Sequence, residues 1–273
     1  MEKKYKFTNE TKKYKGKTLH RIVALRDFSN VIAGEKGGWI EKESNLSHEG
    51  NCWVSDEAIV CDKALVYDNA IVTGNAIIEE YGSVSNRAAV SGNAKVTQHA
   101  SVSDKARVYG DALIGGKAIV GGESVIVLYA IVDGNAYVNG SALVGDFAHI
   151  TGMSYVIENA KIYNHAVIED GYISGHTRIS GKARVTGGVT IYGMAEISGS
   201  AVVKHKEDFI VFKNWWSSGR YFTWTRSNDK YKVGCFHGTG KELIEAAYND
   251  SEEKGREYER IVNYVNSIKN NGK

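Results

Sequence analysis

Residues 88–111 read AAVSGN AKVTQH ASVSDK ARVYGD, which is one six-residue pattern in four consecutive copies. The pattern runs without a break from residue 52 to residue 171, as twenty hexads. The third position is Val or Ile in all twenty, and the first position is Ala in sixteen and Cys, Gly or Ser in the others. Because a β-strand alternates its faces at every residue, these two positions face the same side. The pattern therefore predicts a continuous core of small and β-branched side chains.

The fifth position of the hexad is mostly Gly, Asp or Asn, as at Asp56, Gly74 and Asn86. These residues tolerate a positive φ, so we expect each hexad to end in a sharp corner. Strands joined by such corners form a triangular coil, and successive coils pair as parallel strands. Residues 172–176 are five where six are expected, and the pattern then resumes as far as Val203. The sequence predicts a mostly β protein, a triangular parallel β-helix of nearly nine coils with one tightened corner.

Runs such as Val90–Lys95 and Val138–Leu143 resemble the hexapeptide repeats of left-handed parallel β-helix proteins, the best known of which are trimeric acyltransferases. The resemblance implies a left-handed coil and a homotrimer packed along the prism axis. Two features depart from that family. Gly usually stands two positions after the inward Val or Ile rather than next to it, and no loop interrupts the twenty hexads. The acyltransferases usually extend a loop that helps to frame a catalytic His.

Three parts are expected along the chain: an N-terminal β cap over residues 1–45, the hexapeptide-repeat β-helix over 46–205, and a small α+β domain over 206–273. In the cap, apolar residues alternate around Phe7 and again around Ile22, with a turn at Gly16, which predicts a hairpin. A solenoid exposes its core at its first coil and needs a lid there. We expect Trp39 or Trp53 to lie over that open core, with an aromatic binding site at Trp39 as the alternative.

The C-terminal segment carries a different pattern. Strands are predicted over Phe209–Phe212, Tyr221–Thr225 and Tyr231–Phe236, and helices over 240–249 and from Ser251 onward. Thr239 followed by Glu242 forms a capping box for the first helix. Gly234–Thr239 and Gly255–Tyr258 are similar to those of an uncharacterised C-terminal domain that follows β-helical repeats in bacteriophage and prophage proteins. That family carries no established activity.

Charge is unevenly distributed along the chain. The first 21 residues carry eight basic and two acidic side chains, residues 22–203 carry thirteen and twenty, and residues 204–273 carry thirteen and ten. A basic end can contact nucleic acid or an acidic partner, but lysines that keep two terminal caps soluble explain the same charge. The chain contains no Pro, which suits strands whose amides must all pair.

Composition also bears on location and on metal binding. The sequence has no apolar run of membrane-spanning length and no charged-then-apolar N-terminal segment, so we expect a protein of the bacterial host cytoplasm, without membrane contact. Its three cysteines, Cys52, Cys61 and Cys235, are an odd set without CxxC spacing. This argues against a disulfide framework and against a zinc site, and no metal is predicted.

Stacked coils place residues eighteen apart above one another, so the outer surface can be read in columns. One corner column runs through Asp111, Tyr129, Phe147 and His165, the adjoining column through Leu113, Ile131, His149 and Val167, and a third through Ile119, Tyr137, Tyr155 and Tyr172. These columns are largely apolar over the same coils, and a contiguous exposed apolar patch marks an interface. We predict a subunit interface there, or alternatively a groove for a partner or ligand, formed by Tyr129, Ile131, Tyr137, Phe147, His149, Tyr155 and His165.

His149 and His165 fall near each other in this map. Either could serve as the catalytic base of an acyltransferase or help to hold a metal. No third ligand or adjacent nucleophile accompanies them, so a satisfied or interfacial histidine is the simpler interpretation.

Aromatic residues and arginines gather in the C-terminal segment: Trp215, Trp216, Arg220, Tyr221, Phe222, Trp224 and Arg226. Aromatics that alternate with Arg can stack bases or bind a nucleotide, but they are also what so small a domain needs for its core. We predict that the outward half, Trp216, Arg220 and Arg226, forms a binding surface. His237, near a helix N-terminus, is added because such a turn can hold an anion.

Three functions remain open at this point. The first hypothesis is a non-catalytic, phage- or prophage-encoded homotrimer that binds a host protein or a small anionic, nucleotide-like ligand and inhibits a bacterial defence system. It needs no cofactor, and nucleic acid is a weaker option as partner. The second is a hexapeptide-repeat acyltransferase that uses acyl-CoA, with His149 or His165 as its base. The third is a structural spacer.

Overall fold

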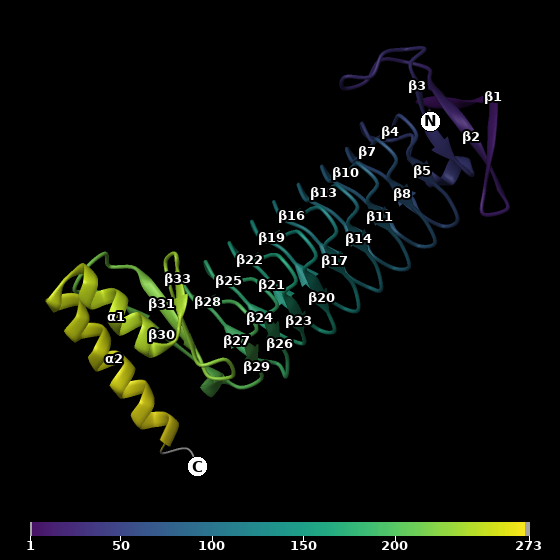
Figure 1. Ribbon diagram of the computed structural model, residues 1–273. Coiled ribbons are helices and arrows are strands. Elements are labelled where there is room, and N and C mark those ends of the chain that lie inside the picture. The colour runs from purple at the N-terminus through teal and green to yellow at the C-terminus, as the bar shows by residue number, and fades with distance from the viewer. Residues whose placement is uncertain (1, 271–273) are drawn as a thin grey trace.

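The computed structural model describes residues 2–270 and shows an elongated, mostly β molecule (Figure 1). A parallel β-solenoid of about nine turns lies between an N-terminal hairpin and a C-terminal unit of four strands and two helices. The fold class predicted from the hexads is therefore confirmed. No helix within residues 2–270 is long and apolar enough to cross a membrane.

Three sheets, whose strands are parallel within the coils, form the sides of the solenoid. The twelve-stranded sheet contains, in spatial order, β1 (Tyr5–Tyr14), β2 (Lys17–Ala24), β3 (Lys36–Ile40), β5 (Ile59–Val60), β8 (Ile77–Ile78), β11 (Lys95–Val96), β14 (Leu113–Ile114), β17 (Ile131–Val132), β20 (His149–Thr151), β23 (Val167–Glu169), β26 (Arg184–Val185) and β29 (Val202–Val203). Its first two pairings, within the hairpin and its extension, are antiparallel.

The other two sheets contain one strand from each coil. The nine-stranded sheet consists of β4 (Trp53–Val54), β7 (Ile71–Val72), β10 (Ala89–Val90), β13 (Arg107–Val108), β16 (Val125–Ile126), β19 (Leu143–Val144), β22 (Lys161–Ile162), β25 (Arg178–Ile179) and β28 (Glu196–Ile197). The eight-stranded sheet consists of β6 (Leu65–Val66), β9 (Ser83–Val84), β12 (Ser101–Val102), β15 (Ile119–Val120), β18 (Tyr137–Val138), β21 (Tyr155–Val156), β24 (Tyr172–Ile173) and β27 (Thr190–Ile191).

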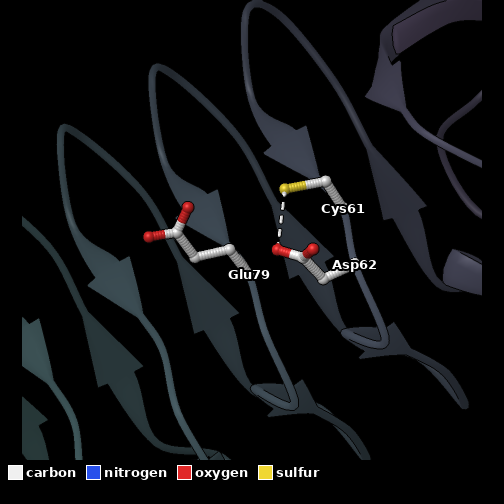
Figure 2. Close-up of side chains that lie close together, drawn as sticks. All are labelled: Cys61, Asp62 and Glu79. Atoms are coloured by element: carbon white, nitrogen blue, oxygen red, sulfur yellow. Dashed lines mark hydrogen bonds between the residues drawn. The ribbon is translucent and has the colours of Figure 1, made fainter. Parts of the chain in front are cut away.

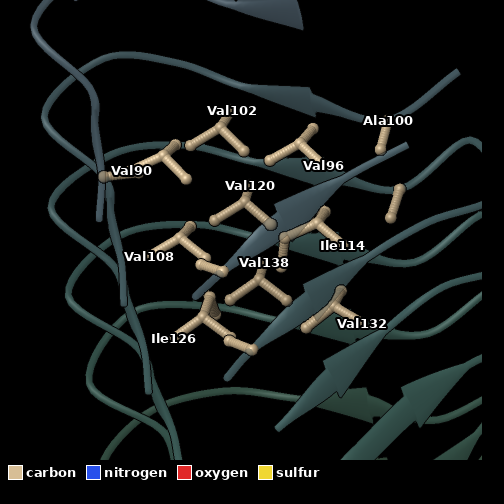
Figure 3. Close-up of a cluster of buried hydrophobic side chains, with 14 of the residues drawn as sticks. Val90, Val96, Ala100, Val102, Val108, Ile114, Val120, Ile126, Val132 and Val138 are labelled. Carbon is tan, nitrogen blue, oxygen red and sulfur yellow. The ribbon is translucent and has the colours of Figure 1, made fainter. Parts of the chain in front are cut away.

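The core and the corners follow the hexad. The inward Val and Ile of adjacent coils stack in register, as Val90, Val108 and Ile126 do on the nine-stranded sheet (Figure 3). These three side chains are 0% exposed. The fifth position has a positive φ in all twenty hexads, which confirms the predicted corners. Leu128 occupies one of these corners, with φ 63°. The conformational cost of a positive φ is higher for Leu than for Gly, Asn or Asp.

The five-residue coil segment shortens one corner and does not end the solenoid. Tyr172 still pairs with Tyr155, and β24 pairs onward with β27. Gly171 makes this corner possible, because a Cβ there would lie 2.9 Å from Ile168 Cγ2 and 3.2 Å from Val185 Cγ1.

The N-terminal cap closes the first coil with apolar side chains and with hydrogen-bond donors. Trp53 packs edge-on against Phe28, at 5.3 Å between ring centroids, and both belong to the core of the solenoid. Trp53 is thus part of the lid, whereas Trp39 lies in a separate cluster beneath the hairpin. The buried Lys4 donates its Nζ to the Cys52 carbonyl at 2.8 Å. Asn45, in the short 3-10 helix Glu43–Asn45, donates its amide to the Ala64 carbonyl at 2.9 Å.

The C-terminal unit closes the other end. It follows a second 3-10 helix, Lys206–Asp208, and comprises β30 (Phe209–Lys213), β31 (Tyr221–Thr225), β32 (Lys230–Val233), β33 (Phe236–Gly238), α1 (Gly240–Asp250) and α2 (Glu252–Asn270). The four-stranded sheet lies between the solenoid and the helices (Figure 1). Thr223 Oγ1 accepts a hydrogen bond from the Glu196 amide at 2.9 Å, and Ser227 Oγ accepts one from the Val202 amide at 2.6 Å. The sheet therefore pairs amides of the last coil that no further coil can reach.

The predicted local structure of this unit is mostly confirmed. Thr239 and Glu242 form the capping box that begins α1. The single returning strand predicted over Tyr231–Phe236 is wrong, because the chain turns at Gly234, with φ 56°, and Phe236 pairs back with Val233. The result is two short strands in place of one.

Candidate functional site

The first predicted column forms an exposed stack of rings. Tyr129 lies on Phe147 at 5.0 Å between centroids, and Phe147 lies on His165 at 4.9 Å, with planes nearly parallel. Tyr129 and Phe147 are 52% and 53% exposed. The stack follows the corner between the nine-stranded and twelve-stranded sheets, next to Ile131 and His149 on the twelve-stranded sheet. We call Tyr129, Phe147 and His165 the corner stack.

The third predicted column lies elsewhere. Tyr137, Tyr155 and Tyr172 follow the eight-stranded sheet, with ring centroids 5.7 and 5.8 Å apart. The chain visits the twelve-, eight- and nine-stranded sheets in that order, so the corner stack lies at the edge opposite the eight-stranded sheet. The corner stack and this tyrosine column are therefore two separate parts of the predicted apolar patch.

The two candidate histidines have different partners. His149 Nε2 lies 3.1 Å from Asp133 Oδ1, and both side chains are about one third exposed. His165 stacks on Phe147. Within residues 2–270 no hydrogen bond joins the two rings. The His149 and Asp133 pair could orient an imidazole as a base, but the pair lies on an open sheet face.

The predicted C-terminal binding residues are not all on the surface. Trp216 is partly buried against the domain core, edge-on to Tyr258 at 5.2 Å and to Phe222 at 6.3 Å. Arg226 lies over the ring of Trp224 and donates its Nε to the Glu207 carbonyl at 3.2 Å. Both side chains hold the unit together. This corrects the interpretation of Trp216 as an outward residue.

His237 lies against the last coil of the solenoid. A Cβ on Gly199 would lie 2.5 Å from His237 Cε1, so this contact requires a glycine. Partial burial lowers the pKa of His237, and the nearby Lys232 and Lys230 lower it further. The lowered pKa disfavours the imidazolium form, which counts against anion binding by the exposed His237 side chain.

Arg220 lines a groove between the solenoid and the C-terminal sheet. The groove has a volume of about 440 Å³, and its lining comprises His176, Arg178, Met194, Glu196, Gly219, Arg220, Tyr221 and Gly234. Arg178 Nη1 lies 3.3 Å from Glu196 Oε1, on the adjacent strand. Within residues 2–270 the Arg220 side chain has no hydrogen-bond or ion-pair partner. We call this hollow the polar compartment.

A second hollow adjoins the first. It has a volume of about 640 Å³ and is lined by Thr190, Tyr192, Gly193, Met194, Lys206, Phe209, Ile210, Val211 and Tyr221. Tyr192 and Met194 are 69% and 45% exposed. We call it the apolar compartment. The two compartments share Met194 and Tyr221, and together they form the junction groove.

The sequence predicted only Arg220 of this groove. His176, Arg178, Tyr192 and Met194 stand at outward or corner positions of the last coils, more than twenty residues from Arg220. A local signal existed at Tyr192 and Met194, where large apolar side chains flank a corner glycine and remain exposed. These residues come to lie beside Arg220 only through the packing of the C-terminal unit against the last coils.

One cluster outside the groove has the donor set of a metal site. Figure 2 shows Cys61, Asp62 and Glu79 together on adjacent coils, with their potential ligand atoms all within 4.8 Å of one another. Three lysines already neutralise it: Lys15 Nζ lies 2.9 Å from Glu79, Lys17 Nζ lies 2.7 Å from Asp62, and Lys95 contacts Glu79. Burial raises the pKa of the Cys61 thiol to about 12, so the sulfur stays protonated. The cluster anchors the turn of the N-terminal hairpin to the solenoid.

The comparisons with known proteins concern the repeat. Residues 64–80 match a family model described as the YdcK beta solenoid repeat. A curated relative, the uncharacterized acetyltransferase YdcK of Escherichia coli (strain K12), is 40% identical over 63 residues, which are 20% of this chain and 19% of that protein. The matched region thus covers about a fifth of the relative. The matches support a β-solenoid protein, and the family model spans β6 to β8, far from the junction groove.

The Glu79 anchor gives a pH prediction. Burial opposes ionisation of Glu79, but hydrogen bonds from Lys95 and Lys15 outweigh it and hold its pKa below the usual 4.5. A depressed carboxyl pKa stabilises the fold above the unfolded value and loses that effect as pH falls through the folded value. Glu79→Gln should therefore lower the free energy of unfolding at pH 7 by roughly 2 kcal/mol and flatten its decline below pH 4.5. Urea titrations across this range measure both effects.

The matched control is Glu123→Gln, which removes an exposed carboxylate paired with Lys105 and should change little. An unaltered pH slope in Glu79→Gln would contradict this account of the anchor.

Proposed function

We propose that the protein is a non-catalytic binding protein whose junction groove holds a small anionic ligand. The observation that carries this proposal is that the Arg220 side chain, which has no hydrogen-bond or ion-pair partner within residues 2–270, lines the same hollow as Arg178. Guanidinium groups bind phosphate and carboxylate through two parallel hydrogen bonds. Glu196 occupies one donor of Arg178 and leaves the others available.

We also propose a biological setting for this binding. The resemblance of the C-terminal unit to phage and prophage domains supports a viral origin and action in the bacterial cytoplasm. In that setting, the junction groove could sequester a small signalling anion. Alternatively, the exposed N-terminal cap and C-terminal unit could block a host protein. We propose that the target of either activity is a bacterial defence system.

Self-association is proposed through the corner stack. Three exposed rings with Leu128, itself 45% exposed, form an apolar edge along several coils. Phe147→Ser should convert a homotrimer of the 29.9 kDa chain into monomers, as measured by sedimentation velocity at micromolar concentration. Tyr155→Ser, on the eight-stranded sheet, is the matched control and should leave the trimer intact. A monomeric wild-type protein would rule out this assembly.

Binding in the groove can be measured by thermal shift with inorganic pyrophosphate. At about ten times its Kd, the ligand should raise the Tm by roughly 3–5 °C. Arg220→Gln should remove most of that shift, because it removes the unpaired guanidinium. Arg184→Gln is the control, since Arg184 lies on the twelve-stranded sheet, paired with Glu169 and away from the groove.

An acetyltransferase is the second candidate. The match to the acetyltransferase YdcK and the pairing of His149 with Asp133 favour it. Under this candidate His149 would act as the base toward an acetyl-CoA substrate. Turnover of acetyl-CoA by the wild type that is lost in His149→Ala, but retained in Arg220→Gln, would overturn the non-catalytic proposal.

A further inference from the structure

We infer that the ligand of the junction groove is a nucleoside phosphate, with its phosphate between Arg178 and Arg220 and its base in the apolar compartment. This inference rests on the proposed function, because it names the ligand class of the same groove. The reasons are the different chemistry of the two compartments, the kind of apolar lining, and the balance of charge.

The two compartments require a ligand with two unlike ends. The polar compartment offers the guanidinium groups of Arg178 and Arg220. The apolar compartment is lined largely by Phe209, Ile210 and Val211 on its C-terminal side, and it meets the polar compartment at shared side chains. An inorganic anion would fill only the first hollow and would leave the second wet. A ligand that joins an anionic group to an apolar one fills both.

The apolar compartment suits a flat ring better than an alkyl chain. Tyr192 is 69% exposed, so its ring is available for one-sided stacking, whereas Tyr221, which is 40% exposed, already has Lys213 Nζ over its ring at 5.7 Å from the centroid. An alkyl chain gains most when it is enclosed on all sides, whereas a base gains about 1–3 kcal/mol from stacking on a single aromatic face. Thr190 and Lys206 also line this compartment, and a hydroxyl or an ammonium can hydrogen-bond to the edge of such a ring, although Lys206 Nζ also lies 3.8 Å from Glu207 Oε1.

The charge of the polar compartment suits a ligand with few phosphates. Arg178 and Arg220 oppose Glu196, which leaves a net charge of about +1 in the polar compartment at neutral pH. Binding to a long polyanion requires many phosphate contacts, which this compartment does not offer. Glu196 pairs with Arg178 and repels phosphate. We therefore expect Glu196 to weaken the binding of phosphate-containing ligands.

Calorimetric titration of the full chain tests the inference with ADP, GDP, pyrophosphate and adenosine as probes. At least one of the two nucleotides should bind about tenfold more tightly than pyrophosphate, because stacking adds to the phosphate contacts. Adenosine should bind at least tenfold more weakly than ADP. Tyr192→Ser should weaken the nucleotide about fivefold and leave pyrophosphate unchanged. Arg220→Gln should weaken both, and Glu196→Gln should tighten both.

The outcomes separate the two proposals. If pyrophosphate binds through Arg220 and neither nucleotide binds more tightly, the groove holds a simple anion, and the inference fails while the proposed function stands. If none of the four probes binds, both fail. Adenosine that binds as tightly as ADP, without effect of Arg220→Gln, overturns the placement of the phosphate. Arg184→Gln is again the control, and an unchanged Tm in the ligand-free variants shows that the fold is intact.

Discussion

The hydrogen bonds that run along the solenoid axis are the constraint on which the rest of the structure depends. Each coil pairs its backbone only with the coils before and after it, so the first and last coils have polar groups that no coil can satisfy. Unpaired buried amides and carbonyls cost about 1–3 kcal/mol each. At the N-terminal end, the Lys4 ammonium donates a hydrogen bond to the Cys52 carbonyl. Burial lowers the pKa of this lysine. At the C-terminal end the hydroxyls of Thr223 and Ser227 accept hydrogen bonds from amides of the last coil.

Closing the second end also creates the candidate site. The hydrogen bond from the Glu196 amide to Thr223 places β31 across the last coil. Arg220 and Tyr221 stand just before Thr223, so they come to lie beside Arg178 and Met194. The groove is thus a consequence of capping, and it requires both parts of the chain. This arrangement places the proposed function at the end of the prism, while the corner stack along its side is left for assembly.

Much of the fold could be predicted from the sequence because its determinants are local and repeated. A positive φ at the fifth position and an inward residue at the third recur in every hexad, and the Thr239 capping box depends on only four residues. The site depends on packing between distant parts. Four successive residues, Phe222 to Thr225, are buried because one face of β31 packs on the domain core and the other on the last coil, so no alternation in the sequence shows which aromatic side chains face outward. Trp216 was predicted to face outward, but it packs against Tyr258 of α2. Residues eighteen apart do stack as the sequence predicted. Which of these columns lie next to each other depends on the order in which the chain visits the three sheets.

The central claim is that the protein acts at the junction groove and not at the corner stack. Hydrogen–deuterium exchange with and without ADP tests it directly, because amide protection reports local opening. The account predicts that ADP increases protection in residues 190–196 and 219–223 and leaves residues 128–131 and 146–149 unchanged. Increased protection at the corner stack with none at the junction would contradict it.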